Sequence, residues 1–369
     1  MTDLDKDLLT LERAADDLRR GYMAVVMAGG AARGDDGRAL ALIPAELANT
    51  PSLARFDMLT DTSFILLTNN RAASLKVPGE DWPVVRIARP AWMKAEDIVA
   101  LADPTLDLAT PLKGPFKRLN HAPDAVDRAA VKLVKWARLL PAVIAAEVPA
   151  SFAADHGFLS VPAPAVLDAD YTQAAKLRQV ASARVPLAGA ENTRLVSFRP
   201  LVGGIEHIAI VIGEPHRHAP VLMRIHSECF TGDLLGSLKC DCGEQLRGAI
   251  KAIGDAGGGV LLYLAQEGRG IGLISKLKAY ALQDQGYDTV DANTRLGFDV
   301  DERVFAPAAE MLKALGFDAV RLMTNNPDKV TGLERFGITV AERVAHKFPT
   351  NPHNEHYLAT KKARTGHLL

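Results

Sequence analysis

Apolar residues recur along the chain with two alternating periods, which predicts alternating helices and strands. Near the start, four apolar residues share one face of a predicted helix at Asp5 to Arg20, and an extended pattern follows at Tyr22 to Met27. After proline-rich connections, a long helical pattern runs from Asp124 to Leu140. The first half of the chain is therefore expected to mix helices with strands.

The second half shows the same alternation more clearly, with short β-branched runs between amphipathic stretches. Pro327 opens one predicted helix and Gly337 closes it. The predicted strands are 207–213, 221–227, 259–266, 319–324 and 338–344, and the predicted helices are 242–257, 273–285 and 326–337. This order predicts an α/β (α+β) fold with a mixed sheet.

A less regular segment separates the two patterned regions. Residues 180–194 carry Pro186 and Gly189 and show no clear period. We therefore expect two domains, at residues 1–174 and 175–369.

Composition excludes several classes of protein. The chain has 369 residues, of which 48% are hydrophobic and 24% charged, as expected for a globular protein. A net charge of -1 argues against nucleic-acid binding, which needs many basic groups. No apolar stretch is long enough for a membrane span, and the acidic start is unlike a signal peptide. With three thiols and no export signal, a cytoplasmic location is expected.

All three cysteines fall within one short stretch, as Cys229, Cys240 and Cys242. A disulfide would leave one thiol over, so this spacing favours a soft metal ion, with zinc as the first choice. Three protein ligands leave a fourth position for a water whose pKa zinc lowers, which suits hydrolysis. The alternative is a structural zinc with His226 as the fourth ligand.

Six motifs carry a resemblance to a known family, and they are HSECFTGDLLGSLKCDCGEQL, QEGRGIGL, AYALQDQGYDT, LGFDVDER, TNNPDK and NPHNEHYL. In this order they resemble the motifs of GTP cyclohydrolase II, over nearly all of residues 180 to 369. The resemblance implies hydrolysis of GTP with release of C8 as formate and of pyrophosphate, which begins riboflavin synthesis. It also implies one zinc ion per subunit on the three cysteines, magnesium with GTP, and a homodimer.

The resemblance also implies a set of nucleotide-binding residues. A carboxylate can accept the N–H groups of a purine, and a turn before a helix can present N–H groups and a guanidinium to phosphate. Taken singly, these residues could equally be surface charges, a plain turn, a helix cap or a solvated lysine. The implied residues are Arg224, Ile225, His226, Ser227, Glu228, Gln245, Glu267, Gly268, Arg269, Thr289, Thr324 and Lys329.

Three further residues are implied to be catalytic. Tyr280 would position water or the formamide, although a core aromatic on a helix is the alternative. Asp301 would act as a general base. Arg303 is a nucleophile toward the α-phosphate in the family interpretation, but a protonated guanidinium is better suited to stabilising phosphoryl charge. A surface ion pair between Asp301 and Arg303 is the alternative.

The first 170 residues resemble dihydroxybutanone phosphate synthase in the stretches LERAADDLRRG, IPAELANTP and AVDRAAVKLVKWARLLPAVIAAEV. The acidic run of that family is replaced by AGGAARGDDGRA, where Asp35 and Asp36 are a poor substitute. Its GHTE motif is matched by NHAP, so His121 is kept while Ala122 and Pro123 replace the threonine and glutamate. We therefore expect a related domain without synthase activity.

Three alternatives to a riboflavin-pathway cyclohydrolase remain open. One is a paralogue of the family in another pathway, such as pyrimidine catabolism. Another is a regulatory module that binds zinc and nucleotide without turnover, whose zinc would be needed for folding. The last is a bifunctional enzyme in which the first domain is active.

Overall fold

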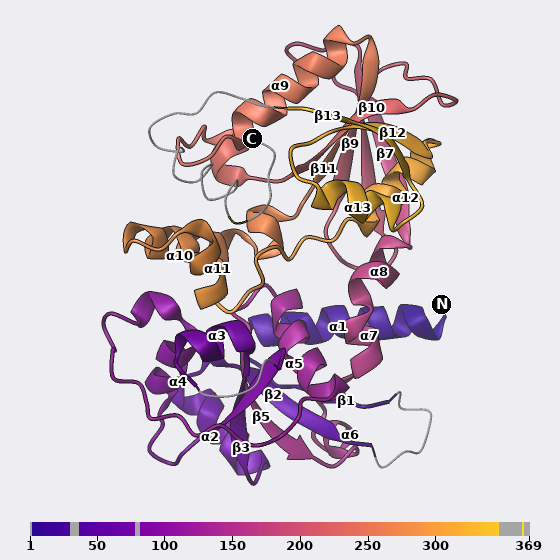
Figure 1. Ribbon diagram of the computed structural model, residues 1–369. Helices are drawn as coiled ribbons and strands as arrows, with labels where there is room; N and C mark the ends of the chain where they lie inside the picture. Colours follow the sequence, from indigo (N-terminus) through magenta and orange to yellow (C-terminus); the bar gives the residue numbers. More distant parts are fainter. Residues whose placement is uncertain (1, 30–36, 78–81, 347–363, 365–369) are drawn as a thin grey trace. The chain divides into compact units, whose positions relative to one another are not determined.

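The computed structural model describes residues 2–29, 37–77, 82–346 and 364 (Figure 1). The chain forms two compact units: unit 1 is Met1–Ala169 with Ile274–Glu302, and unit 2 is Asp170–Leu273 with Arg303–Leu369. Asp35, Asp36 and the motif at 351–358 lie outside the described residues. Unit 1 therefore draws on two separate stretches of chain.

Unit 1 is built on a six-stranded sheet in the order β4-β3-β5-β2-β1-β6, in which only the β1–β6 pair among these strands is parallel. Successive residues of a strand point to opposite faces, so Val25 enters one apolar core and Val26 the other. The strands are β1 (Ala24–Met27), β2 (Ala39–Pro44), β3 (Ser63–Thr68), β4 (Val84–Ala88), β5 (Ala142–Val148) and β6 (Leu159–Pro162).

Helices from the first stretch of unit 1 add apolar residues to both of its cores. The helix predicted at the start runs as α1 from Asp3 to Arg19, because Thr2 and Asp5 form a capping box. The other helices are η1 (Ala45–Leu47), α2 (Thr50–Leu59), α3 (Asn69–Ser74), α4 (Ala95–Ala102), η2 (Pro104–Leu106), α5 (Ala125–Trp136), α6 (Phe152–His156), α7 (Ala163–Leu167), α10 (Leu273–Asp284) and α11 (Thr289–Arg295).

Helices α10 and α11 are tied to the first stretch of unit 1 by polar contacts. The hydroxyl of Thr68 donates to the carbonyl of Gly297 at 2.7 Å, and the amide of Asn70 donates to the carbonyl of Phe298 at 2.9 Å. Lys278 forms an ion pair with Asp103. These contacts join residues that are far apart in sequence.

A cluster of charged side chains, here called the arginine–carboxylate cluster, lies in unit 1 and consists of Arg38, Arg86, Asp124, Asp127 and Glu147. The fully buried Asp127 carboxylate accepts from Arg86 at 2.7 Å and from Arg38 at 3.1 Å. His121 of the NHAP motif lies 3.3 Å from the same carboxylate. The chain therefore supplies its own cations to these acids.

Unit 2 contains a seven-stranded mixed sheet in the order β13-β12-β10-β11-β9-β8-β7. Strands β10 to β13 pair in parallel, and β7, β8 and β9 add antiparallel pairs. The strands are β7 (Leu177–Arg184), β8 (Thr193–Pro200), β9 (His207–Gly213), β10 (Val221–Ser227), β11 (Gly258–Leu264), β12 (Ala319–Met323) and β13 (Thr339–Val344). The predicted α/β class with a mixed sheet is confirmed.

Both faces of the sheet of unit 2 carry apolar cores. Helix α12 packs into one core and helix α9 into the other. The helical segments are α8 (Ala169–Ala174), η3 (Phe230–Leu234), α9 (Cys242–Asp255), η4 (Glu267–Gly270), α12 (Ala306–Leu315) and α13 (Asp328–Glu334). Among the residues described, no helix combines the length and apolar character that a membrane span requires.

One expectation from the sequence is wrong. The segment expected to be irregular, 180–194, contains the end of β7 and the start of β8, which pair as a hairpin. Strand β7 is the edge of the sheet and is exposed along almost all its length, so its residues show no alternation of apolar and polar character.

Candidate metal and nucleotide site

The three cysteines converge in unit 2 although they come from different elements. Cys229 follows β10, Cys240 lies in the loop beyond η3, and Cys242 is the first residue of α9. Their sulfur atoms all lie within 4.8 Å of one another, and those of Cys229 and Cys240 are 3.7 Å apart. Tetrahedral zinc with Zn–S bonds of about 2.3 Å would hold two sulfurs about 3.8 Å apart. The sulfur spacing therefore fits zinc.

Gly232 of η3 makes room for this cysteine cluster. Its N–H donates to the Cys229 sulfur at 3.3 Å. A Cβ atom at this position would lie 2.7 Å from the Cys240 sulfur and 3.0 Å from the Cys229 sulfur. Only glycine therefore leaves the sulfurs where they are.

The thiols of the cluster disfavour charge when no cation is present. The hydrogen bond with the Cys229 sulfur raises the pKa of Cys240 to about 11. Hydrogen bonds with Cys229 and Cys240, together with burial, raise the pKa of Cys242 well above its usual range. Three thiolates this close together would repel one another unless a cation lay between them. A bound metal ion favours the deprotonated sulfur and so reverses the preference for the neutral thiol.

His226 is not part of this sulfur cluster. Its Nε2 lies 3.0 Å from a carboxylate oxygen of Asp233, and its ring stacks on Tyr263 with centroids 5.6 Å apart. Among the described residues, the group that could hold a metal contains the three cysteines and no histidine. The alternative of a structural zinc with His226 as fourth ligand finds no support here.

Asp233 connects the parts of this region. Besides His226, its carboxylate accepts the backbone N–H of Cys229 at 3.0 Å and the hydroxyl of Tyr263 at 3.0 Å. Burial and the nearby Asp233 charge raise the pKa of Tyr263, so its hydroxyl stays protonated. The sequence analysis assigns no role to Asp233 or Tyr263. The one sequence feature that could have pointed to Asp233 is its position between Cys229 and Cys240.

Arg224 lies in the middle of β10 and is 4% exposed, so it is not a surface charge. One guanidinium nitrogen donates to the side-chain oxygen of Gln245, and another donates to the carbonyl of Met323 at 3.3 Å. Burial lowers the pKa of Arg224 to about 10, and the positive charge of Arg303 contributes to the shift. Gln245 in turn donates to Asp241, next to Cys242. A buried cation therefore stands beside the cysteine cluster.

The QEGRGIGL turn is also anchored to the cysteine loop. One oxygen of the buried Glu267 accepts the N–H of Phe230 at 2.6 Å, and the other accepts the N–H of Gly268 at 2.9 Å. Gly268 and Arg269 both adopt left-handed conformations, with φ of 62° and 60°. The Glu267 carboxylate therefore links two loops next to the cysteines, so this segment is more than a plain turn.

Lys329 and Thr324 are buried next to the end of β10. The ammonium of Lys329 donates to the carbonyl of Ile225 at 2.8 Å, so the alternative of a solvated lysine is wrong. Thr324 accepts the N–H of Asn326 at 3.0 Å in the loop before α13. On β10 itself, the Ser227 hydroxyl is buried without a hydrogen-bond partner among the described residues, and Glu228 follows with its N–H bonded to Leu264.

Two residues near this region are not singled out by the sequence. His346 Nε2 lies 3.0 Å from the carbonyl of Gln245, and the His346 backbone exchanges hydrogen bonds with the Asn325 side chain. Burial and the charge of Arg224 lower the pKa of His346 to about 4. The contact with Gln245 spans about a hundred positions, which no local pattern can reveal.

Four predicted residues remain to be placed, and they are Tyr280, Thr289, Asp301 and Arg303. Tyr280 on α10 is partly exposed, with the Lys276 ammonium 5.7 Å from its ring centroid, so it is not a core aromatic. Thr289 begins α11, where Gln283 donates to its hydroxyl at 3.4 Å. These two residues and Asp301 belong to unit 1, whereas Arg303 belongs to unit 2, with its guanidinium 5.7 Å from the ring centroid of Phe305.

Comparison with known proteins gives the same family for the region that holds the site. A family model described as GTP cyclohydrolase II matches residues 178–345. A GTP cyclohydrolase-2 from Azospirillum brasilense is 49% identical over 366 residues, which cover 97% of this chain and 94% of that relative. One from Cronobacter sakazakii is 55% identical over 194 residues, which cover 53% of this chain and 98% of that relative.

Among solved structures, the chain is similar to a two-domain 3,4-dihydroxy-2-butanone 4-phosphate synthase from A. baumannii, with 15% identity and a TM-score of 0.33 over 92% of this chain and 99% of that one. A synthase of Candida albicans matches 43% of this chain and 96% of its own, with 17% identity and a TM-score of 0.33. From its identity to the Azospirillum relative over nearly the whole sequence, the chain belongs to the GTP cyclohydrolase II family.

Proposed function

We propose that this protein hydrolyses GTP to 2,5-diamino-6-(5-phosphoribosylamino)pyrimidin-4(3H)-one, formate and pyrophosphate, the first step of riboflavin biosynthesis. The observation that carries the proposal is the cysteine cluster, with sulfurs within 4.8 Å of one another, in a chain of this family. The buried Arg224 and its partner Gln245 stand next to that cluster.

The donor set fits a catalytic zinc ion, one per subunit. Cys229, Cys240 and Cys242 would hold the ion through three sulfurs and leave a fourth position open. A zinc ion held there would supply Lewis-acid activation for hydrolysis at C8 of the purine and then at the formamide. Gly232 leaves space for the three sulfurs, and Asp233 orients the Cys229 backbone.

The purine would be recognised by polar groups around this cluster. The Glu228 carboxylate can accept purine N–H groups, while the Gln245 amide offers both a donor and an acceptor. The segment from Arg224 to Ser227 and the turn residues Glu267, Gly268 and Arg269 complete the proposed nucleotide site. Buried polar groups of this kind discriminate against ligands that leave them unpaired.

The triphosphate would be bound by the positive charges of unit 2. Arg303, Lys329 and the Thr324 hydroxyl are the proposed phosphate ligands, with magnesium on the phosphate oxygens. The role we propose for Arg303 is to stabilise charge as pyrophosphate leaves, because a guanidinium stays protonated at neutral pH. Tyr280, Asp301 and Thr289 keep their predicted roles on the strength of the family resemblance.

The organisation of the protein is proposed on the same basis. The family match at 178–345 falls within the predicted cyclohydrolase domain, 175–369. Residues 1–174 would form a domain related to the synthase that has lost its activity. A cytoplasmic homodimer without nucleic-acid or membrane partners completes the proposal.

The test is to incubate the purified full chain with GTP and magnesium, with and without zinc chelation. Formate, pyrophosphate and the pyrimidine product would be followed by mass spectrometry. Zinc-dependent release of both formate and pyrophosphate is expected. Pyrophosphate without formate would indicate altered ring chemistry, and neither product would indicate a binding or regulatory protein.

A second assay addresses the pathway and the first domain. Ribulose 5-phosphate added to the same protein should yield no dihydroxybutanone phosphate. If that product forms, the enzyme is bifunctional.

A further inference from the structure

A cavity lies in unit 2, at the end of the sheet opposite to the cysteine cluster. Its volume is about 560 Å³. Gly213, which lines it, pairs with Gly258 at the start of β11, whereas the cysteine cluster follows Ser227, which pairs with Leu264 at the end of β11. Seven residues of strand separate the two ends by about 20 Å.

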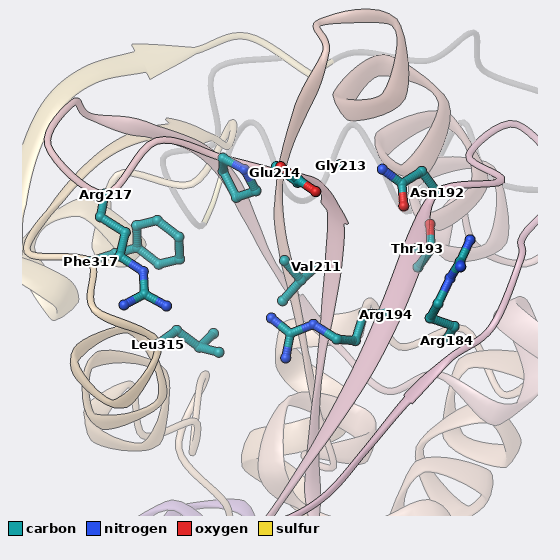
Figure 2. Close-up of a pocket in the computed structure, with 11 residues that line it drawn as sticks. Arg184, Asn192, Thr193, Arg194, Val211, Gly213, Glu214, Arg217, Leu315 and Phe317 are labelled. Carbon is teal, nitrogen blue, oxygen red and sulfur yellow. The ribbon is translucent and has the colours of Figure 1, made fainter.

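Three arginines line this cavity, which Figure 2 shows in close-up: Arg184, Arg194 and Arg217. Arg184 of β7 and Arg194 of β8 are direct partners in the antiparallel register. Like charges placed directly opposite each other disfavour pairing in a sheet, and both of these side chains are exposed to solvent.

The protein itself offers little charge compensation. Arg194 donates to the neutral hydroxyl of Ser182 at 3.2 Å. Within the described part of the chain, Arg184 and Arg217 take part in no ion pair, and Glu214 is the one acidic residue lining the cavity. The cavity therefore carries an excess of positive charge in a protein whose net charge is -1.

Arg217 is placed by the backbone of the neighbouring helix. It comes from the loop after β9 and passes over Gly316, the residue that ends α12. A Cβ atom on Gly316 would lie only 3.4 Å from the Cδ of Arg217. In Figure 2 the guanidinium groups of Arg194 and Arg217 extend toward the same space, between Val211 and Leu315, whereas that of Arg184 points away from them.

We propose that this cavity is a second ligand site, which binds the phosphate group of a small phosphorylated molecule. Guanidinium groups form paired, charge-assisted hydrogen bonds with phosphate, and those of Arg194 and Arg217 face each other here, with Arg184 adding a third positive charge to the lining. The volume is in the usual range for small-molecule sites, and Val211, Leu315 and Phe317 provide an apolar floor for an organic part.

The test is titration calorimetry of the zinc-loaded full chain at low salt, with inorganic phosphate and with adenosine 5′-monophosphate as probes. The double variant Arg194→Ala/Arg217→Ala should weaken binding of both probes by about tenfold or more, because each charge-assisted hydrogen bond is lost. Arg217→Lys should recover part of the loss, since a lysine keeps the charge but not the fork of donors.

Arg178→Ala is the matched control, because this exposed arginine also lies on β7 and does not line the cavity. It should change binding by less than about twofold. Thermal midpoints of all variants should stay close to wild type, which verifies that each is folded. Tighter binding of the nucleotide than of phosphate would identify an organic phosphate as the ligand, and equal binding a free phosphate anion.

Three outcomes would overturn the proposal. One is unchanged phosphate binding in the double variant. Another is an equally large loss of phosphate affinity in Arg178→Ala, which would mean that phosphate is attracted by positive charge in general. The third is a loss of phosphate affinity in Arg303→Ala but not in the double variant, which would place the phosphate at the opposite end of the sheet.

Discussion

The two units each contain a cluster of ionisable side chains, and the clusters neutralise their charge in different ways. In unit 1, the arginine–carboxylate cluster holds its acids with Arg38 and Arg86 from the same unit. In unit 2, the cysteine cluster has three sulfurs within 4.8 Å of one another, and hydrogen bonds among the thiols raise the pKa of Cys240 and of Cys242 when no cation is bound. The cysteine cluster thus needs a cation from solution, whereas the arginine–carboxylate cluster already contains the cations that balance its acids.

The same contrast bears on the first domain. Asp127 and Glu147 both contact guanidinium groups, and His121 of the NHAP motif lies 3.3 Å from Asp127. A guanidinium in contact with these carboxylates occupies the space that a divalent cation would need. This arrangement supports the expectation that the domain has lost synthase activity.

The largest expected effect is on the cysteine cluster. Cys242→Ser should lower zinc content to near zero and reduce formate release by more than about a hundredfold, since even supporting residues of metal sites affect activity by ten- to a hundredfold. Metal analysis and the formate assay measure this. Leu238→Ala, an exposed residue of the same loop, is the control and should behave as wild type.

The next largest effect concerns the buried acid of unit 1. Asp127→Asn removes the buried one of the two carboxylates that Arg38 and Arg86 share, the other being Glu147, and should lower the free energy of unfolding by about 3–5 kcal/mol. Chemical denaturation measures it. Asp57→Asn removes a more exposed partner of Arg89 and should cost less than about 1 kcal/mol. Equal losses in both variants would contradict the idea that burial sets the cost.

A smaller effect is expected for Gly232→Ala. The added methyl group would press on the Cys240 and Cys229 sulfurs, so zinc affinity should fall by about ten- to a hundredfold. Competition with a chromogenic chelator gives the affinity. Gly29→Ala, where a Cβ atom meets nothing within 4 Å, serves as the glycine control. Unchanged zinc affinity would mean that the sulfurs can shift freely.

The units should also differ in their response to acid. Burial lowers the pKa of His346 to about 4, so the neutral form is favoured when folded, and stability present above about pH 6.5 is lost as pH falls toward 4. Burial would raise the pKa of Asp107, but Arg71 and Lys113 lower it to about 2, so its contribution is present above about pH 4 and is lost only as pH falls toward 2.

Calorimetry of the zinc-loaded protein from pH 7 to 4 should therefore show unit 2 weakening first. His346→Gln should reduce this acid sensitivity by about 2–4 °C in the midpoint, because glutamine does not titrate. If His346→Gln were as sensitive to acid as wild type, the loss of stability at low pH would come from other titratable groups.

The smallest expected effect concerns Arg38, the cation that the chain itself supplies to the arginine–carboxylate cluster. Arg38→Ala should make unit 1 respond to an external ion, with about 10 mM Mn²⁺ raising its midpoint by about 2–4 °C. Wild type and Arg38→Lys, which both keep a cation, should not respond. A response in all three would show that the carboxylates bind metal despite the arginine.

The sequence predicts the strands of this protein better than it predicts contacts between distant residues. Strands β9 and β10 match the predicted ranges 207–213 and 221–227, because alternation and β-branched residues are local signals. The convergence of the cysteines also follows from short spacing. The hairpin of β7 and β8 was hidden because an exposed edge strand lacks an apolar period.

Long-range partners lie beyond such signals. Asp233, which joins His226, Tyr263 and the Cys229 backbone, carries only the weak signal of its place in the cysteine motif. The pairing of Arg38 with Glu147 spans 109 positions and depends on how β2 and β5 align. Tertiary packing sets these contacts, so no local pattern contains them.

Because unit 1 is completed by residues 274–302, its assembly on the ribosome has a timing constraint. The partners of Thr68 and Asn70, Gly297 and Phe298, are synthesised well over a hundred residues after Ala169. At about 5–20 residues per second, the first stretch waits roughly 6 to 26 s for them. During that interval the nascent first stretch lacks its final contacts, and unit 2 begins to emerge before unit 1 is complete.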